Sequence, residues 1–296
     1  MGTNHTATYS ISGGSLSAIG GGGNVKLGGS ADGASTALLT LTNSGKIVAS
    51  GSIQGYGGAA GSQAFTFGGG TLVAGGVNMT ALADAIGNAT GTLVNNGGTV
   101  SPGDSGVAGK TTITGNYSAS ASANLSIDLN GATAATAFTD SGAFYDTVAV
   151  SGTATLGGNL IVRTNGFAPA ATNAFTILTS SSVSGTFANL TGGRVTVSGS
   201  TNTFAVLVTA SSVILTNFSG SAAATPPSPA SITTTYNGST LVLSWPSGQG
   251  WRLQTQTNTL SIGLNTNWAN VSGATPPFTN SPNAANGTVF YRLVWP

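Results

Sequence analysis

The stretch that decides the fold is GTLVNNGGTVSPGDSGVAGKTTITGNYS, residues 91–118. Short runs of Thr and apolar residues alternate in it with Asn-Gly and Pro-Gly-Asp clusters. Glycine adopts positive φ angles without steric cost, so such clusters allow sharp corners in the chain. Runs of this length with alternating side chains are typical of half-buried strands. The stretch therefore predicts short strands separated by tight corners.

The same pattern continues over residues 1 to about 220, and helix signals are nearly absent there. The one helical candidate is Thr80–Ile86, which is closed by Gly87, and a loop is the alternative for it. Further strands are predicted at Ala37–Thr42, Lys46–Ser50, Ala64–Phe67, Thr71–Val73, Gly91–Val94, Thr111–Gly115, Asn124–Leu129, Thr147–Val150, Asn159–Val162, Ala174–Leu178, Arg194–Val197 and Thr203–Val208.

Two all-β architectures fit such short strands: a β-solenoid of stacked turns and a sandwich of antiparallel hairpins. The related phrases GGTLVAGG and TGTLVNNGG place Leu72 and Leu93 about one solenoid turn apart, at about 20 residues per turn. Small residues, and Asn beside the corners, favour stacking with ladders of like side chains. The expected fold is therefore a solenoid, whose two ends are open sheet edges that must be capped or paired.

Composition limits the possible partners. Only 4% of the 296 residues are charged, the formal net charge is +1, and no Glu or Cys is present. The basic residues are scattered singly, which excludes nucleic acid and a polybasic membrane anchor as partners. No apolar run reaches the length of about 18 residues that a membrane span needs. A surface of Thr, Ser, Asn and Gly tolerates close contact with copies of itself, which indicates an assembled extracellular material.

The residues from GTLVNNGGTVSPGDSG to LSIDLNG, followed by YDTVAVSGTATLGGNLIV and FTILTSSSVSGTF, resemble autotransporter-associated β-strand repeat proteins of the Verrucomicrobia and Planctomycetes type. This similarity covers about residues 91–190, and residues 1–90 resemble looser repeat units. The resemblance implies a right-handed parallel β-solenoid (β-helix) with an adhesive or structural role at a bacterial cell surface.

Composition also divides the chain. The segment TPPSPAS, Thr225–Ser231, is typical of a linker, and all four Trp residues lie beyond it. We expect a solenoid domain over 1–222, a linker over 223–231 and a small β-sandwich over 232–296. The phrases LVLSWP and VFYRLVWP resemble strands of a fibronectin type III-like module. Because the segment is shorter than an ordinary module, strands are missing or are supplied by a neighbouring subunit.

Residues that carry chemistry are sparse. His5 is the only His, which excludes zinc sites and Ser-His-Asp chemistry. Asp140 and Asp146 bracket SGAFY and could form a carboxylate pair for glycoside hydrolysis or Ca²⁺ binding, but a turn cap and a strand start are the simpler interpretation. Asp104 is interpreted in the same way. A polysaccharide-lyase site on a β-helix needs clustered Asp, Lys or Arg side chains. Lys110, Asp128 and Arg163 are far apart in sequence, so they predict no such cluster. We predict no catalytic residues, no metal and no cofactor.

The Trp residues allow a sugar-binding platform. Trp245 and Trp251 alternate with Leu residues and are expected in the core, whereas Trp268 and Trp295 are the candidates for glycan stacking.

We therefore expect an extracellular structural protein without enzymatic activity, the subunit of a self-assembling surface filament or matrix fibre. The partner is another copy of the chain, through solenoid-end and strand-sharing contacts. The alternatives are a monomeric adhesin that binds surface polysaccharide and an inert spacer of a larger protein. The expected contact residues lie in the first and last strands: Tyr9, Ile11, Phe290, Tyr291, Val294 and Trp295.

Overall fold

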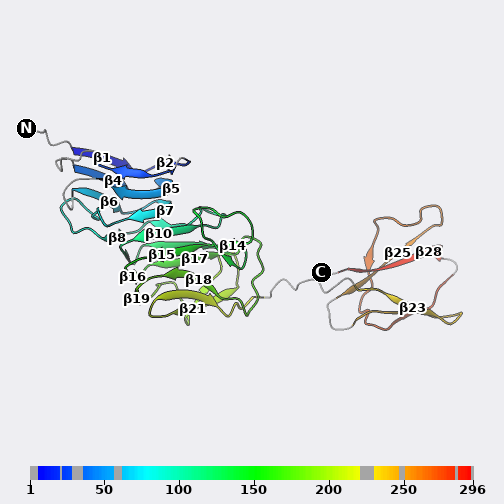
Figure 1. Cartoon of the computed structure of the whole chain (residues 1–296). Helices are drawn as coiled ribbons and strands as arrows, with labels where there is room; N and C mark the ends of the chain where they lie inside the picture. Colours follow the sequence, from blue (N-terminus) through cyan, green and yellow to red (C-terminus); the bar gives the residue numbers. More distant parts are fainter. Residues whose placement is uncertain are drawn as a thin grey trace, which may run out of the picture. The chain divides into compact units, whose positions relative to one another are not determined.

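The structure is a computed structural model that describes residues 6–20, 22–28, 36–56, 62–220, 230–246, 251–283 and 286–294. The chain divides into two compact units, Met1–Ala222 and Ala223–Pro296, and each is considered by itself. The described residues of both units form strands and loops without an α-helix. The first unit stacks its strands one above another from β1 to the β21 region (Figure 1).

The first unit contains three rows of stacked strands. Row 1 is a seven-stranded parallel sheet in the order β1-β4-β6-β8-β11-β16-β19. Its strands are β1 Thr6–Ile11, β4 Thr36–Leu41, β6 Gln63–Phe67, β8 Thr92–Asn95, β11 Asn116–Ala119, β16 Thr153–Leu156 and β19 Ser182–Gly185. A parallel sheet made from one chain in this order fits a β-solenoid, in which each turn adds one strand to the row.

Rows 2 and 3 belong to one larger sheet, because two long strands run through both of them. Row 2 contains β2 Ser15–Ala18, the first halves of β5 Lys46–Gly55 and β7 Thr71–Asn78, and then β9 Thr99–Val100, β12 Asn124–Asp128 and β17 Asn159–Arg163. Row 3 contains β3 Val25–Leu27, the second halves of β5 and β7, and then β10 Lys110–Thr114, β15 Thr147–Val150 and β18 Phe175–Thr179.

The opening stretch of sequence forms most of one turn. It contains β8, β9 and β10 and the start of β11. The corner between β8 and β9 is held by Asn95, whose Oδ1 accepts the Gly98 N–H at 2.8 Å and whose Nδ2 donates to the Gly98 carbonyl at 3.0 Å. Asn95 is fully buried, so its amide satisfies backbone groups that would otherwise be buried without partners.

Turn length varies more than the sequence indicated. From Thr92 to Asn116 one turn takes 24 residues, and from Asn116 to Thr153 it takes 37. The longer turn contains a projecting loop with the small strand pair β13 Thr133–Ala134 and β14 Phe144–Tyr145. The expected spacing of about 20 residues per turn is therefore too short.

One local prediction is also wrong. Leu72 and Leu93 do not share a row: Leu72 pairs with Val100 in row 2, and Leu93 pairs with Tyr117 in row 1. Of the two alternatives for residues 80–86, the loop is the one observed. Ala83 in this loop makes isolated bridges to Ala64 and Thr90, so the loop lies against the edge of β6.

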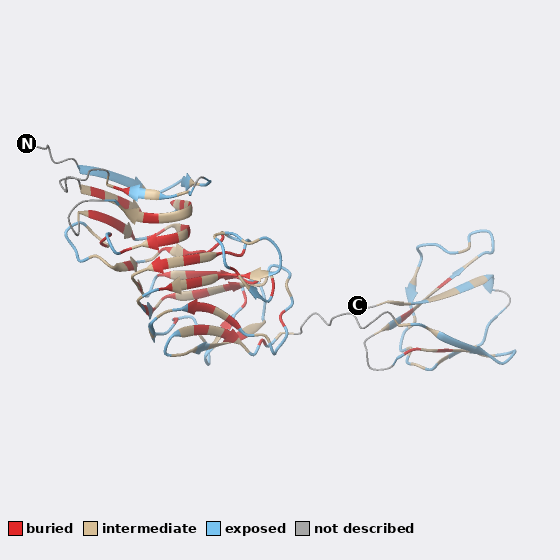
Figure 2. Cartoon of the chain, viewed as in Figure 1, coloured by how far each residue is buried: buried red, intermediate tan, exposed pale blue. Residues whose placement is uncertain are grey.

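The core of the first unit is a continuous apolar column. In β4 the burial alternates strictly, with Ala37, Leu39 and Leu41 buried and the intervening residues half-buried. Stacked turns repeat the alternation, and Leu39 and Leu41 are in register with Phe65 and Phe67. Figure 2 shows these buried bands running through the middle strands. Burial of this column is the main stabilising term of the unit.

The second unit contains two antiparallel three-stranded sheets. One has the order β23-β24-β27, and the other β26-β25-β28. Their bounds are β23 Thr233–Tyr236, β24 Leu241–Ser244, β25 Arg252–Asn258, β26 Ala269–Asn270, β27 Phe278–Asn280 and β28 Thr288–Val294. Side chains from both sheets share one apolar cluster around Leu243, Trp245 and Leu253, so the two sheets pack face to face as a small sandwich.

Candidate functional site

The first turn of the solenoid is an open end. Among the described strands, β1 pairs only with β4, while β2 and β3 pair only with β5. Each of these strands therefore has one edge without a strand partner. Figure 2 shows β1 exposed above the banded strands of the following turns. A row of free N–H and C=O groups on a parallel edge is a template for another strand.

The open end also exposes residues that occupy core positions. Tyr9 is in register with Leu39, yet Tyr9 is 68% exposed and Leu39 is 1% exposed. Leu16 is in register with Ile47, and it is exposed while Ile47 is fully buried. Ile11, the other expected contact residue of β1, is half-buried against the core cluster. The open end therefore exposes apolar side chains at positions whose register partners in the next turn are buried.

The opposite end is capped, which is one of the two outcomes expected for a solenoid end. The strands β20 Arg194–Thr196, β21 Thr203–Val208 and β22 Ser212–Thr216 form an antiparallel extension, with β22 paired to β18. Row 2 is covered where the Ser198 N–H donates to the Val162 carbonyl, and row 1 where the Val183 N–H donates to the Ala210 carbonyl. Phe204 closes the core, edge-on to Phe175 with 5.8 Å between ring centroids.

A second free strand edge lies in the C-terminal unit. Within the part of the chain that the structure describes, β28 pairs only with β25. Phe290, Tyr291 and Val294, the expected contact residues, lie on this edge strand and are half-buried. Trp295 lies outside the described residues. The structure thus places both groups of expected contact residues on free edges, one group on β1 and one on β28.

The described glycan-stacking candidate is partly occupied. The Arg292 guanidinium lies 4.3 Å from the ring centroid of Trp268, and its Nε donates to Gln254 Oε1 at 2.8 Å. One face of the indole is therefore covered by a cation, an arrangement that stabilises the sheet through a cation–π contact.

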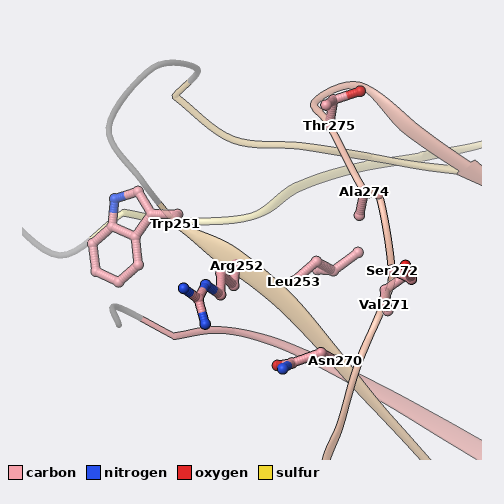
Figure 3. Close-up of a pocket in the computed structure, with 9 residues that line it drawn as sticks. Trp251, Arg252, Leu253, Asn270, Val271, Ser272, Ala274 and Thr275 are labelled. Carbon is pink, nitrogen blue, oxygen red and sulfur yellow. The ribbon is translucent and has the colours of Figure 1, made fainter.

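The other two Trp residues belong to the sandwich core, as their alternation with Leu predicts. Trp245 is buried, and Trp251 packs against the same cluster. Trp251 also lines a shallow pocket of about 360 Å³ together with Arg252 and the loop after β26 (Figure 3). Asn270, Ser272 and Thr275 contribute polar groups to that pocket.

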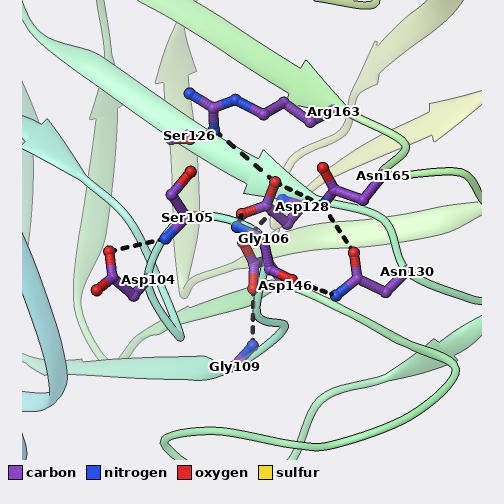
Figure 4. Close-up of polar contacts among 10 residues, drawn as sticks. All are labelled: Asp104, Ser105, Gly106, Gly109, Ser126, Asp128, Asn130, Asp146, Arg163 and Asn165. Carbon is purple, nitrogen blue, oxygen red and sulfur yellow. Dashed lines mark hydrogen bonds and ion pairs between the residues drawn. The ribbon is translucent and has the colours of Figure 1, made fainter.

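A buried polar cluster lies where row 2 meets the projecting loop (Figure 4). Asp146 is fully buried, and its two oxygens accept the N–H groups of Gly109 at 2.7 Å and Asp128 at 2.8 Å. Asp128 is also fully buried and accepts the Gly106 N–H at 2.8 Å and the Asn165 Nδ2–H at 2.9 Å. Both carboxyl groups thus tie successive turns together.

The electrostatics of this cluster follow from its burial. Burial raises the pKa of Asp146 to about 9, although the N–H groups of Asp128 and Gly109 lower it. Arg163 lies 3.8 Å from Asp128 Oδ1 and donates from Nη1 to Ser126 Oγ at 2.6 Å. The acids have no exposed surface, so their contacts are with the protein rather than with a ligand.

Asp128 and Arg163 are far apart in sequence, and the stacking of turns brings them together. Asp128 and Arg163 are register partners on β12 and β17. One signal was present in the sequence: the two strands read NLSID and NLIVR, with Asn-Leu at the same relative position. The aligned Asn124 and Asn159 form an amide ladder contact at 3.2 Å, as expected for stacked like residues.

The remaining acidic candidates have structural contacts. Asp140 Oδ2 accepts the N–H groups of Thr136 and Ala137, which is the turn cap predicted for it. Asp104 has a φ of 83° and forms an ion pair with Lys46. Lys110 lies at the start of β10, in register with Thr147, and His5 lies outside the described residues.

Over the described ranges, no group of three or more His, Cys, Asp or Glu side chains could hold a metal ion. The same residues contain no helix that is long and apolar enough to cross a membrane. Comparisons with protein-family models, with curated proteins and with solved structures give no significant match. The candidate site is therefore defined by geometry alone, as the free edges of β1 and β28 and the apolar residues beside them.

Proposed function

We propose that this protein is a structural subunit of an extracellular filament or matrix fibre on a bacterial surface, and that it assembles through the open end of its solenoid. The observation that carries the proposal is the exposure of core positions on the first turn. Covering a side chain such as Tyr9 with another element contributes about 25 cal/mol of stabilising free energy per Å² of apolar surface removed from water. Association of copies is the direct way to cover it.

The capped end gives the assembly a polarity. Solenoids cannot stack head to tail through two bare ends, because β20, β21 and β22 cover one of them. Growth beyond a pair then needs a second contact surface, and the free β28 edge supplies one. Among the described strands, the subunit therefore carries one open solenoid end and several free sandwich edges, of which β28 is one.

The scarcity of charge supports an extracellular assembled state. With 4% charged residues, the surface offers few of the edge charges that keep β-proteins apart. The resemblance to autotransporter-associated repeat proteins supports the same location. We also propose right-handed winding of the solenoid, because crossover connections between parallel strands are right-handed in about 98% of cases.

Analytical ultracentrifugation and electron microscopy over a range of concentrations test this function. The wild-type chain is expected to form polymers whose length grows with concentration. The Tyr9→Lys variant carries a charge on the open end and is expected to form only short particles. Short, monodisperse particles of the wild-type chain at every concentration would overturn the proposal.

Carbohydrate binding by a monomer is the second candidate. The pocket beside Trp251 and Arg252 favours it, because an indole, a guanidinium and the polar groups of Asn270 and Ser272 meet there. Binding on a glycan array that is lost in both Arg252→Ala and Asn270→Ala would support this candidate, and an array without signal would reject it.

A further inference from the structure

We infer that the C-terminal sandwich has a slot for a seventh strand between β23 and β28, and that β1 of a second copy fills it. The inference rests on the proposed function and specifies its contact. It starts from the inner faces of the two small sheets, where several residues in core positions are exposed.

The first sheet shows this on β23. Directly opposed residues of an antiparallel pair point to the same face, and Thr234 opposes Leu243 while Tyr236 opposes Leu241. Leu243 is 2% exposed and Leu241 packs against the core cluster. Even so, Thr234 is exposed and Tyr236 is 61% exposed. Within the described part of this unit, the inner face of β23 therefore has no strand that covers it.

The second sheet shows the matching gap beside β28. Leu293 opposes the buried Leu253, so Leu293, Tyr291 and Val289 share the inner face by alternation. Val289 is nevertheless 38% exposed. Because β28 pairs with β25 on one side only, the position next to β28 and opposite β23 has no strand within the described residues.

A cavity marks the same place. It has a volume of about 440 Å³, and its lining includes Tyr236, Leu241, Asn280, Val289 and Tyr291. The unit correspondingly has only three fully buried apolar residues among those described, Leu243, Trp245 and Leu253. One added strand would complete the second sheet, cover Tyr236 and Val289 and enlarge this core, as in strand addition by β-augmentation.

The strand β1 has the properties of such a donor. It alternates Ala7, Tyr9 and Ile11 with Thr and Ser, and one of its edges is free. The faces that would meet are uncharged, since Thr6–Ile11 and the residues that line the cavity include no charged side chain. Arg292, the charged residue of β28, alternates with Tyr291 and Leu293 and lies over Trp268 on the other face of the sheet. Pairing therefore buries no charge and leaves none without a partner.

The stoichiometry points to a second copy as the source of the strand. Among the described strands, β1 and β28 each have one edge without a strand partner, so each chain offers one donor edge and one acceptor edge for this pairing. A contact between two different surfaces of the same chain is heterologous and leaves one of each surface free at the ends, so it continues into a filament. Row 1 of one copy would then be extended by the β26-β25-β28 sheet of the next.

Two variants that each block one edge test this pairing. Tyr9→Lys puts a charge on the donor strand, and Val289→Lys puts a charge in the slot. Both positions are exposed, so the folded units are expected to persist, and circular dichroism checks this. We expect each variant alone to be monomeric. Mixed in equal amounts, they are expected to form heterodimers only, because each retains the edge that the other lacks.

Other outcomes separate the alternatives. Dimers of Val289→Lys alone would mean that β1 pairs with β1, and dimers of Tyr9→Lys alone would mean that β28 pairs with β28. Either result overturns the inference, and so does a mixture that stays monomeric while the wild-type chain polymerises. A wild-type chain that never polymerises overturns the proposed function instead. If Val289→Lys fails to fold, Tyr236→Lys replaces it.

Matched controls carry the same charge elsewhere. Leu207→Lys lies on β21 at the capped end, and Leu264→Lys lies in the second unit on the loop after β25. These residues are 50% and 65% exposed. Both control variants are expected to polymerise like the wild-type chain, which would show that an added lysine alone does not prevent assembly.

Discussion

Tyr9 and Leu39 are neighbours in the stacking register of row 1, yet one is 68% exposed and the other 1% exposed. Both residues occupy the same position of their strand and point toward the same column. The difference arises because, among the described strands, Leu39 has a strand on each side and Tyr9 has a strand on one side only. Burial in the described part of this unit therefore depends on how many stacked turns lie beside a residue.

This relationship predicts unequal effects of two truncations. Phe65→Ala, in register with Leu39 and fully buried, is expected to lower the free energy of unfolding by about 3–5 kcal/mol because it leaves a cavity. Tyr9→Ala is expected to cost less than about 1 kcal/mol in dilute protein. Urea denaturation measures both, and equal losses would contradict the open end.

The corners predict a contrast between two glycines. A Cβ on Gly98 would lie 2.0 Å from Cε2 of Phe67, whereas a Cβ on Gly68 would meet its nearest atom at 3.5 Å. Because Phe67 is buried and cannot move aside, Gly98→Ala is expected to cost about 1–3 kcal/mol or more. Gly68→Ala is expected to stay within about 0.5 kcal/mol of the wild type. Thermal denaturation of the two variants gives the comparison, and similar melting temperatures would argue against this corner geometry.

The buried Asp146 predicts a pH dependence. Its pKa rises from 3.8 to about 9 on folding, so between these values the folded chain holds a proton that the unfolded chain has released. Stability from this group is fully present below pH 3.8 and is lost as the pH rises through 9, at up to about 1.4 kcal/mol per pH unit. Comparing the free energy of unfolding between pH 6 and pH 8.5 in the wild type and in Asp146→Asn isolates this effect. The wild type is expected to lose more stability than the variant, and equal slopes would be inconsistent with a buried, protonated Asp146.

The uncharged contact faces predict that assembly is insensitive to salt. Interactions between exposed charges weaken as ionic strength rises, but β1 has no charged residue and the cavity beside β28 is lined by none. The association constant is therefore expected to change by less than about twofold between 0.05 and 0.5 M NaCl. Sedimentation at several salt concentrations checks this, and a steep fall in affinity would indicate an ionic contact.

The local pattern was sufficient to predict the strands and many of the corners. Thr147–Val150 and Thr203–Val208 are predicted with their observed bounds, because alternation and glycine clusters act over a few residues. Lys46–Ser50 and Thr71–Val73 are predicted too short, since β5 and β7 continue through Gly51 and Gly75. A Cβ on Gly75 would lie 2.5 Å from the Ser50 carbonyl, so here glycine allows neighbouring turns to approach closely instead of ending the strand.

Contacts between turns could not be predicted in the same way. The register of Asp128 with Arg163 depends on the length of the projecting loop, and the pair Asp128 and Asp146 depends on how that loop closes. The cap over β18 depends on an antiparallel return of β22, whose sequence resembles that of the parallel strands. The expected contact residues lie in the first and last strands of the sequence, but the free edges of β1 and β28 follow from the pairing order of the strands, which the local pattern does not contain.

Amide hydrogen exchange of β1 at low and high protein concentration tests the central claim most directly. If copies assemble through the open end, exchange of the amides of Thr6–Ile11 is expected to slow as polymers form, because new hydrogen bonds and reduced exposure protect them. Exchange in β21 at the capped end is expected to stay constant. Polymers in which Thr6–Ile11 exchanges as fast as in the dilute chain would contradict the account.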